Sequence, residues 1–562
     1  MGRNRQRSNG HAEPFASEAA DLCDAEPAKY SPRASAPSGP VTWMSLPRKD
    51  QLAILFLARL VDFLQFASLQ AYVFYQLKSM DETLSDAQIS QQAGLLQGCF
   101  TGAQVMTAML WGKAADAAWC GRKWAVIFGL AGTAISCVGY GFATTFFWAA
   151  FWRVFGGAVN GTVGVVRTML SEVIKDRKYQ SRAFLILPMS FNVAGILGPP
   201  MGGILADPTK TLPGLFGDGA IFGFAWIRQY PYALPSIMNA LALMTVTTII
   251  YLFLEETSMS RRHLLDPGLT LGHKIKQRLF GNKSYAGYDP INDHEEVALT
   301  TTTANAKPKA RNFTRRLPFT RLWTRNVIFT LITGAFFDFN LGAFGNIWSL
   351  FLSTPRYLDA QVQAQQKSRR SLPLLFTGGL GMPASTVGVA TSFLGLIGMA
   401  LQIFLYPPVQ ARLGTLRSFR LFLCLFPVCY FLAPYLAILP STTTAPEAAS
   451  GLLIWMGIVF ILFLQVCART FTMPASIILL NNCSPHPSVL GTIHGLGQSV
   501  SAASRTIGPV VGGWWYGYGL DIGMVAWGWW GVAAMSALGC TTALCMYEGS
   551  GHEIVLEGEE DE

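Results

Sequence analysis

Two stretches of the sequence decide the fold, GILGPPMGG at residues 195–203 and RTIGPVVGG at residues 505–513. Both contain the pattern GPxxGG. Glycines three and four residues apart lie on one helix face and let two helix backbones approach closely, and each proline removes a backbone donor. The residues of interest are Gly195, Gly198, Pro199, Gly202 and Gly203 in the first copy, and Gly508, Pro509, Gly512 and Gly513 in the second. An internal repeat of this kind predicts two halves of similar architecture.

The composition places these halves in a membrane. Charged residues make up 13% of the 562 residues, about half of the roughly 25% that is usual in soluble proteins. Hydrophobic residues reach 51%, and a soluble surface built from so few charges would expose large apolar patches. These values exclude a soluble enzyme. They predict an all-α polytopic membrane protein whose main partner is the lipid bilayer.

Twelve apolar runs are long enough to cross a bilayer, which takes about 20 residues per helix. The predicted spans cover residues 50–77, 91–115, 124–143, 146–172, 182–206 and 231–254 in the first half, and 326–352, 384–407, 416–438, 450–480, 489–516 and 522–546 in the second. We therefore expect twelve transmembrane helices in two six-helix bundles. The predicted parts are a disordered tail (1–48), the first bundle (49–256), a polar linker (257–324), the second bundle (325–547) and an acidic tail (548–562).

The net charge of +9 does not indicate binding to nucleic acid, because the Lys and Arg residues are gathered in a few segments between the apolar runs. Such segments mark the cytoplasmic ends of membrane spans. Their distribution predicts that both termini and the linker are cytoplasmic, and that the sequons at Asn282 and Asn312 carry no glycan. The ten cysteines form no CxxC pair and no Cys/His ligand spacing, so we expect no metal site and no cofactor.

Five charged residues interrupt the apolar runs and are candidates for the functional site: Asp62, Arg153, Asp338, Arg469 and Arg505. An unpaired charge in a span costs at least about 2.5–3.5 kcal/mol, so each is expected to face the protein interior with a partner. Asp62 is the first candidate partner for Arg153, and Arg59, one turn before Asp62, is an alternative partner of that carboxylate. We hypothesise that Asp62 carries a proton and that Arg153 tunes it. Asp338 is expected to bind a cationic substrate or a second proton.

A further motif joins the second and third spans. The run Trp111-Gly112-Lys113-Ala114-Ala115-Asp116 is followed by four residues and then by Gly121-Arg122-Lys123. Charges at a span end are weakly coupled when open to water, and strongly coupled when a neighbouring helix end covers them. We interpret Gly112, Asp116, Gly121, Arg122 and Lys123 as a latch that stabilises one of two conformations.

These features resemble the signatures of the major facilitator superfamily. Its motif between helices 2 and 3 has a Gly, an Asp and then Gly-Arg-Arg/Lys, although here four residues rather than two follow Asp116. Arg153 with Gly157 and Gly161 is similar to the helix-4 motif, and GPxxGG is typical of the proton-coupled antiporters of the superfamily. More narrowly, the chain resembles fungal drug-antiporter-like facilitators and the plant zinc-induced facilitator-like group. The resemblance also suggests that Glu172, at the end of the fourth span, meets the arginine of the latch.

From this resemblance we expect a secondary active transporter that moves a small organic solute by alternating access, as a monomer coupled to protons. Antiport at the plasma or vacuolar membrane is the expected mechanism, giving efflux or sequestration. A uniporter or symporter of a metabolite, and a non-transporting sensor or scaffold of the same fold, stay open as alternatives. An enzyme is not expected, because no catalytic cluster accompanies the seven histidines and the linker lacks a GxxxxGK[ST] run.

Overall fold

The computed structural model describes residues 46–174, 186–217, 219–258, 261, 266–280, 318–356, 376, 378–486, 489–549 and 554. The chain divides into a unit Met1–Leu46 and a unit Pro47–Glu562, and the helices lie in the second unit. The N-terminal tail up to residue 45, most of the linker with Asn282 and Asn312, and most of the acidic tail lie outside the described residues. The predicted boundaries of these parts stay predictions.

The first half is a bundle of long helices. It contains α1 (Lys49–Gln70), α2 (Val73–Met80), α3 (Asp86–Asp116), α4 (Gly121–Gly141), α5 (Phe146–Val159), α6 (Thr162–Val173), α8 (Ile186–Leu205) and α12 (Ala233–Phe253), with the short helices α9 (Pro208–Thr211), α10 (Pro213–Phe216) and α11 (Ala225–Gln229) before α12. The bundle forms because α1 packs on α8 and α12, and α4 packs on α5 and α12. Two predicted spans are each divided, the first into α1 and α2, the fourth into α5 and α6.

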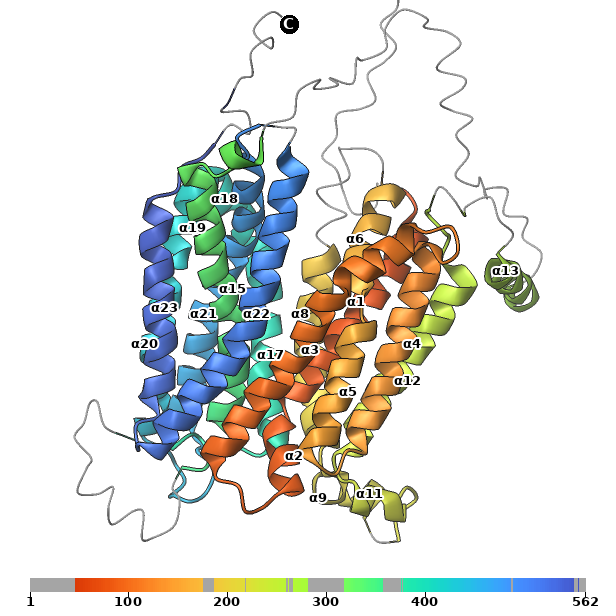
Figure 1. Cartoon of the computed structure of the whole chain (residues 1–562). Helices are drawn as coiled ribbons and strands as arrows, with labels where there is room; N and C mark the ends of the chain where they lie inside the picture. Colours follow the sequence, from red (N-terminus) through yellow and green to blue (C-terminus); the bar gives the residue numbers. More distant parts are fainter. Residues whose placement is uncertain are drawn as a thin grey trace, which may run out of the picture. The chain divides into compact units, whose positions relative to one another are not determined.

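The second half lies beside the first (Figure 1). Its helices are α15 (Arg325–Ser353), α17 (Ala384–Ala400), η3 (Leu401–Leu405), α18 (Tyr406–Leu413), α19 (Thr415–Leu423), α20 (Leu425–Leu432), η4 (Ala433–Ile438), α21 (Leu452–Asn482), α22 (Leu490–Asp521) and α23 (Ala526–Leu544), preceded by η2 (Phe319–Leu322). Trp529 is fully buried at its centre. The rings of Phe344, Trp348, Phe351 and Tyr430 surround Trp529, with centroids between 5.7 and 6.5 Å away. This aromatic cluster fixes α15, α20 and α23 against one another.

Seven of the described helical segments are both long and apolar enough to cross a membrane: Lys49–Gln70, Gly121–Gly141, Ala233–Phe253, Arg325–Ser353, Ala384–Leu413, Thr415–Ile438 and Leu452–Asn482. Long helices α3 and α22 fall outside this set because they carry Gln and Gly residues where they pack on other helices. Large side chains such as Leu452 (75% exposed) and Phe404 (77% exposed) cover the surface, as expected where helices face lipid. The protein is therefore an all-α polytopic membrane protein, as predicted.

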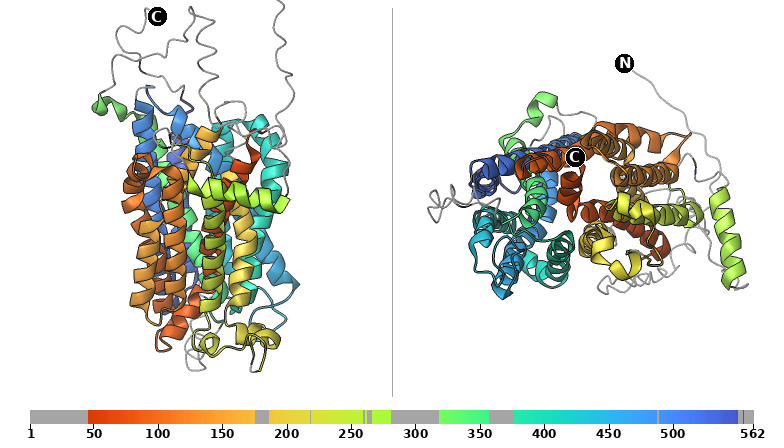
Figure 2. Two further views of the ribbon diagram at one scale, coloured as in Figure 1. Left: turned by 90° about the vertical axis from the view of Figure 1, so that its right-hand side faces the viewer. Right: turned by 90° about the horizontal axis from the view of Figure 1, so that it is seen from below.

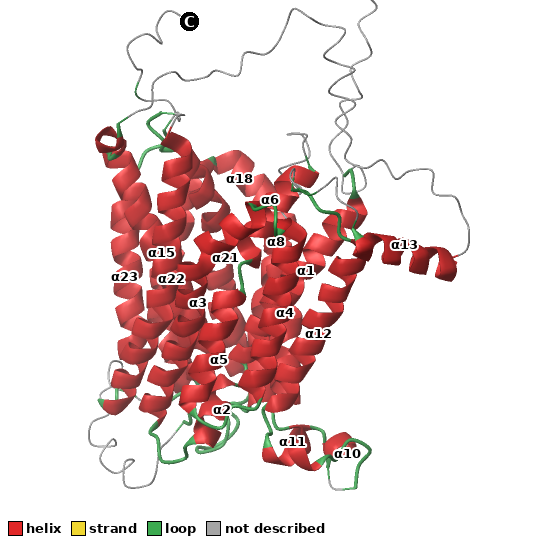
Figure 3. Cartoon of the chain, turned by 45° about the vertical axis from the view of Figure 1, so that its right-hand side comes forward, coloured by secondary structure: helices red, strands yellow, loops and turns green. Residues whose placement is uncertain are grey.

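The two ends of the bundle differ in what they carry. We call the end with the α3–α4 turn and α13 (Pro267–Phe280) the linker end, and the end with α9 and α11 the loop end (Figures 1 and 3). At the loop end, Ser85 begins α3 with a reciprocal cap, since its hydroxyl accepts from the Gln88 amide (3.3 Å) and the Gln88 side chain accepts from the Ser85 amide (3.0 Å). Such a capping box fixes where a helix starts.

The two halves contact each other through α8 with α17 and through α3 with α22. Near the loop end the backbones of the two halves touch, since a Cβ added to Gly94 of α3 would lie 2.4 Å from the carbonyl oxygen of Pro509 in α22. Toward the linker end, Met106 and Met109 of α3 are 82% and 79% exposed, and Gly112 meets no atom within 4 Å. Figure 1 shows α3 and α22 diverging in this direction, and Figure 2 shows the two halves side by side when seen along the bundle. The α3–α22 seam is thus packed at the loop end and unpacked at the linker end.

Candidate functional site

A buried ion pair lies inside the first half. Asp62 of α1 is 6% exposed, and Arg59, one turn earlier, forms an ion pair with it. Asn160 Nδ2 and Thr162 Oγ1 donate to the same carboxylate at 2.6 and 3.0 Å. The guanidinium carbon of Arg59 also lies 4.3 Å from the ring centroid of Phe63. The carboxylate is therefore held by a guanidinium, an amide and a hydroxyl, all from the first half.

The partners of Asp62 reach it because the fourth span breaks at Asn160. This residue leaves the helical conformation with φ −84° and ψ 77°, which ends α5 and turns the chain into α6. Helix α3 satisfies the carbonyls that the break frees. Gln104 Nε2 donates to the oxygen of Asn160 at 3.1 Å, and Trp111 Nε1 donates to the oxygen of Ala158 at 2.8 Å. Irregular backbone inside a membrane is stable only with such buried partners.

The predicted pairing of Arg153 with Asp62 is wrong. Arg153 of α5 is 4% exposed, and its Nη2 donates to Gln97 Oε1 at 3.3 Å while its guanidinium carbon lies 4.3 Å from the ring centroid of Phe100. Both partners belong to α3. Arg59, not Arg153, pairs with Asp62, because Arg59 lies one turn away on the same helix.

A small cavity lies beside Arg153. Its polar lining comes from Gln65, Tyr72, Thr133, Ser136, Tyr140, Ser236 and Asn239. The cavity volume is about 20 Å³, which is enough for a water molecule. Among the described residues, no hydrogen-bond partner meets Arg153 Nε, the Tyr140 hydroxyl or Asn239 Oδ1. Buried polar atoms of this kind are ordinarily satisfied, so the cavity is suited to hold water or another small polar group.

Arg469 of α21 takes part in a polar contact between the two halves. Its Nη2 donates to Asn192 Oδ1 of α8 at 3.1 Å, and its guanidinium carbon lies 4.6 Å from the ring centroid of Phe191. Asn192 Nδ2 in turn donates to Gln402 Oε1 at 2.8 Å. A first-half asparagine thus joins two polar groups of the second half.

Asp338 and Arg505 form an ion pair in the second half. Asp338 Oδ1 in α15 lies 3.2 Å from Arg505 Nε in α22, and the side chains are 14% and 51% exposed. Arg505 Nη2 also donates to Ser501 Oγ at 2.6 Å. The next residue, Thr506, faces Gly102 of α3, with 3.3 Å between its methyl group and the position of an added Cβ. The pair therefore lies beside the seam where the halves begin to part.

The two GPxxGG copies have matching contacts. In the first, Gly198 and Gly202 face α1, with added Cβ atoms 2.8 Å from Ala67 Cβ and 2.2 Å from the Ser68 oxygen. In the second, the corresponding glycines face α15, the first long helix of its own half. An added Cβ on Gly508 would lie 2.5 Å from the Phe339 oxygen, and one on Gly512 would lie 3.1 Å from Ala343 Cβ.

The last glycine of each copy faces the opposite half. An added Cβ on Gly203 would lie 2.1 Å from the Ala384 oxygen in α17, and one on Gly513 would lie 2.7 Å from the Ser90 oxygen in α3. Gly195 also faces α17, since an added Cβ there would lie 3.5 Å from Gly395 Cα. Each copy thus packs its helix within one half and against the other, as two similar halves require.

The latch residues cluster at the linker end of the first half. Arg122 pairs with Glu172 of α6, the contact that the family resemblance suggested, and its Nη2 lies 3.3 Å from Asp116 Oδ1. Glu256 accepts from the backbone amides of Arg122 and Lys123, both at 3.1 Å. The side chain of Asp116 is 71% exposed. Asp116, Glu172 and Glu256 all belong to the first half, so a role of the latch in switching between two conformations stays a prediction.

A family model of the Major Facilitator Superfamily matches residues 52–364, more than half of the chain. The chain belongs to the major facilitator superfamily. Major facilitator superfamily multidrug transporter mfsB of Aspergillus fumigatus is 31% identical over 535 residues, which cover 90% of this chain and 84% of that relative. Protein Zinc Induced Facilitator 1 of Arabidopsis thaliana is 23% identical over 464 residues, covering 82% and 83%.

Solved structures of two transporters share the fold. A bacterial homologue of the human lysosomal transporter Spinster, in an inward-facing and occupied conformation, aligns with a TM-score of 0.55 and 14% identity over 88% of this chain and 96% of that one. The inward-open xylose transporter XylE from E. coli aligns with a TM-score of 0.55 and 11% identity over 88% and 95%. These findings confirm the resemblance to fungal and plant facilitators, and the chain is a membrane transporter rather than an enzyme.

Sequence reasoning missed two features of this site. The break at Asn160 was not predicted, although the following Gly161 and Thr162 are poor helix formers inside an apolar run. The contact of Lys123 Nζ with Asp266 Oδ2, at 2.6 Å, was also missed. These two residues are far apart in the sequence, and no local pattern relates them.

Proposed function

We propose that this transporter exports a small organic solute in exchange for protons, working as a monomer by alternating access. Three observations support the proposal: a buried carboxylate at Asp62, an ion pair beside the seam between the halves, and a seam that is packed at one end only. The relative named a multidrug transporter favours an organic substrate over an inorganic ion. With the linker end in the cytoplasm, as the distribution of basic residues predicts, export would run to the outside or into the vacuole.

The observation that carries the proposal is the buried contact of Asp62 with Arg59. Protonation of Asp62 removes the charge that this guanidinium faces, and a buried cation that loses its partner destabilises a protein by about 3–5 kcal/mol. The two protonation states therefore favour different positions of Arg59, Asn160 and Thr162. These residues join α1 to the break between α5 and α6. Proton binding is thereby linked to helix arrangement, and the linkage acts in both directions.

The second half supplies the complementary site. Asp338 and Arg505 lie where the seam opens, and a cationic group of a substrate that approaches Asp338 competes with the guanidinium for the same carboxylate. We assign Asp338 to substrate binding and Asp62 to the proton. Arg469 and Asn192 connect the two halves and are assigned to the transmission of movement from one half to the other.

The test uses purified protein in sealed vesicles that contain a pH-sensitive dye, with rhodamine 6G as an organic-cation probe. We expect the wild type to accumulate the probe when a pH gradient is imposed, with protons moving in the opposite direction. Asp62→Asn is expected to lose gradient-driven accumulation and to keep downhill movement of the probe, because the amide can neither release nor take up the proton. The control is Asp81→Asn, which changes an exposed carboxylate between α2 and α3.

The outcomes separate the alternatives. Full gradient-driven accumulation by Asp62→Asn would contradict the proton role. Wild-type transport that ignores the gradient would favour a uniporter, and protons moving with the probe would favour a symporter. A wild-type protein that moves none of a panel of cationic, neutral and anionic solutes would favour a sensor or scaffold of the same fold.

A further inference from the structure

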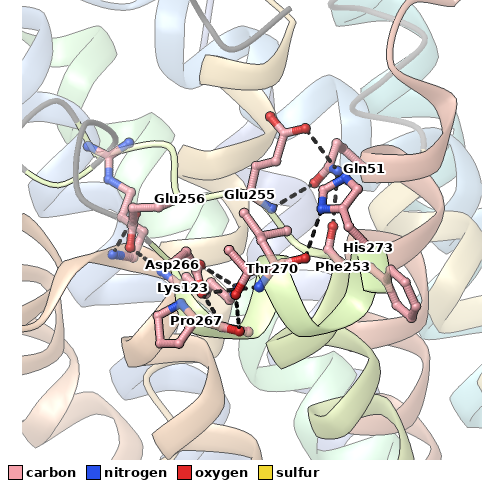
Figure 4. A network of polar contacts seen from close by, with 12 residues as sticks. Gln51, Lys123, Phe253, Glu255, Glu256, Asp266, Pro267, Thr270 and His273 are labelled. Atoms are coloured by element: carbon pink, nitrogen blue, oxygen red, sulfur yellow. Dashed lines mark hydrogen bonds and ion pairs between the residues drawn. The ribbon is translucent and has the colours of Figure 1, made fainter. Parts of the chain in front are cut away.

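Helix α13 leaves the bundle at a steep angle to the long helices. It lies outside the bundle beside the first half, near the linker end, and runs away from α12, as Figures 1, 2 and 3 show from three directions. Asp266 starts the helix, since its Oδ1 accepts from the amides of Gly268 (2.9 Å) and Leu269 (3.3 Å). Its Oδ2 accepts from Lys123 Nζ of α4, whose side chain is 1% exposed. A buried cation of the first bundle thus anchors the first turn of α13 (Figure 4).

The depth of α13 follows from its contact with α12. Added Cβ atoms on Gly268 and Gly272 would each lie 2.1 Å from a carbonyl oxygen, that of Tyr251 and that of Leu252. These two residues belong to the last turn of the apolar span that ends at Phe253. An apolar span ends where the hydrocarbon meets the headgroups. Helix α13 therefore lies along the boundary between membrane and water.

The side chains of α13 suit such a boundary. At 100° per residue, Leu271 and Ile275 lie on one side of the helix, where Leu271 is 47% exposed. On this wheel Lys274 and Arg278 lie on one side of Leu271 and Ile275, and Lys276 lies on the other side, beyond Gly272, which packs on α12. All three basic side chains are exposed. A helix with an apolar stripe between basic edges is typical of peptides that lie in the headgroup layer of membranes.

We propose that α13 is a lipid-binding helix, with Leu271 and Ile275 directed into the bilayer and Lys274, Lys276 and Arg278 bound to the phosphate and carboxylate groups of anionic phospholipids. Charge complementarity selects anionic lipids over neutral ones. Each Lys or Arg near an anionic membrane surface strengthens binding to that surface. Three of them give on the order of a hundredfold preference for anionic over neutral membranes at low salt. Because α13 is joined through Lys123 to the helix that carries Arg122, bound lipid would hold the latch end of the first half at the membrane surface. The proposal does not depend on proton coupling.

The experiment measures amide hydrogen exchange of α13 in the purified full-length protein, in nanodiscs of phosphatidylcholine alone or with added phosphatidylglycerol. We expect α13 amides to exchange more slowly with phosphatidylglycerol, and this protection to decline as salt rises and screens the charges. The variant K274Q/K276Q/R278Q is expected to lose the difference between the two membranes. The matched control is R321Q/R412Q/R417Q, which removes three exposed basic residues from η2, α18 and α19 and is expected to keep the difference.

The wild-type comparison needs no variant, so the proposal stays testable if the triple substitution unfolds α13. Equal exchange of α13 in the two membranes would overturn it, as would protection that does not change with salt. An equal loss of protection in the control variant would overturn it as well, because the effect would then follow overall charge. Transport is not measured, so failure of the antiport proposal would leave this result unaffected.

Discussion

Substitution of Gly203 by alanine tests whether the two halves must touch at the loop end. An added Cβ would lie 2.1 Å from the oxygen of Ala384, 2.8 Å from its carbonyl carbon and 3.0 Å from Ser385 Cα. These are backbone atoms of the opposite half, so no side-chain rotation relieves the clash, and α8 and α17 must move apart by about 1 Å. Overpacking of this kind costs about 1–3 kcal/mol. The cost applies only to the conformation with this contact closed, so we expect its population to fall by a factor of about 5–150.

The assay is a distance measurement between two spin labels at the loop end, one at Glu82 in the first half and one at Thr444 in the second. Both positions are exposed, and the ten native cysteines are replaced beforehand. Gly203→Ala is expected to increase the population with the longer distance. The matched control is Gly164→Ala, because an added Cβ there meets no atom within 4 Å. Unchanged distances in Gly203→Ala, or an equal shift in the control, would show that the contact of Gly203 with α17 does not hold the loop end closed.

Three further substitutions have expected outcomes. Trp529→Ala removes the ring at the centre of the aromatic cluster and is expected to destabilise the second half by about 3–5 kcal/mol, seen as a lower melting temperature; an unchanged melting temperature would contradict it. Lys123→Met leaves Asp266 without its cation and should speed amide exchange in α13 but not in α15. Asp338→Asn should raise the KM for rhodamine 6G with little change in kcat, and a loss confined to kcat would argue against substrate binding.

The repeated GPxxGG pattern shows how far local sequence reaches. The pattern predicted two similar halves with close helix contacts, and the contacts of Gly198 and Gly508 follow that scheme. It did not indicate that the last glycine of each copy faces the opposite half. A glycine has the same chemistry on either side of a helix, so only the packing of neighbouring helices assigns Gly203 to α17 and Gly513 to α3.

The charged residues show where sequence reasoning fails. Their rarity within apolar runs marked Asp62 and Arg153 as buried, because an unpaired charge in a membrane is costly, and both are buried. Partner choice was wrong for Arg153. The partners of Asp62 depend on the break at Asn160, which positions an amide and a hydroxyl against this carboxylate. A break of one residue leaves almost no trace in the hydropathy of the span.

Composition and residue spacing were enough to predict a protein that spans a membrane, has two related halves and contains a few buried charges. These properties follow from composition and spacing, which set the free energy of transfer into lipid for each segment. The packing of the helices determines which charges meet, which end of the seam is packed and where α13 lies. Those features depend on contacts between residues far apart in the chain, such as Lys123 with Asp266 and Asn192 with Arg469. Such contacts form only once the helices have packed together.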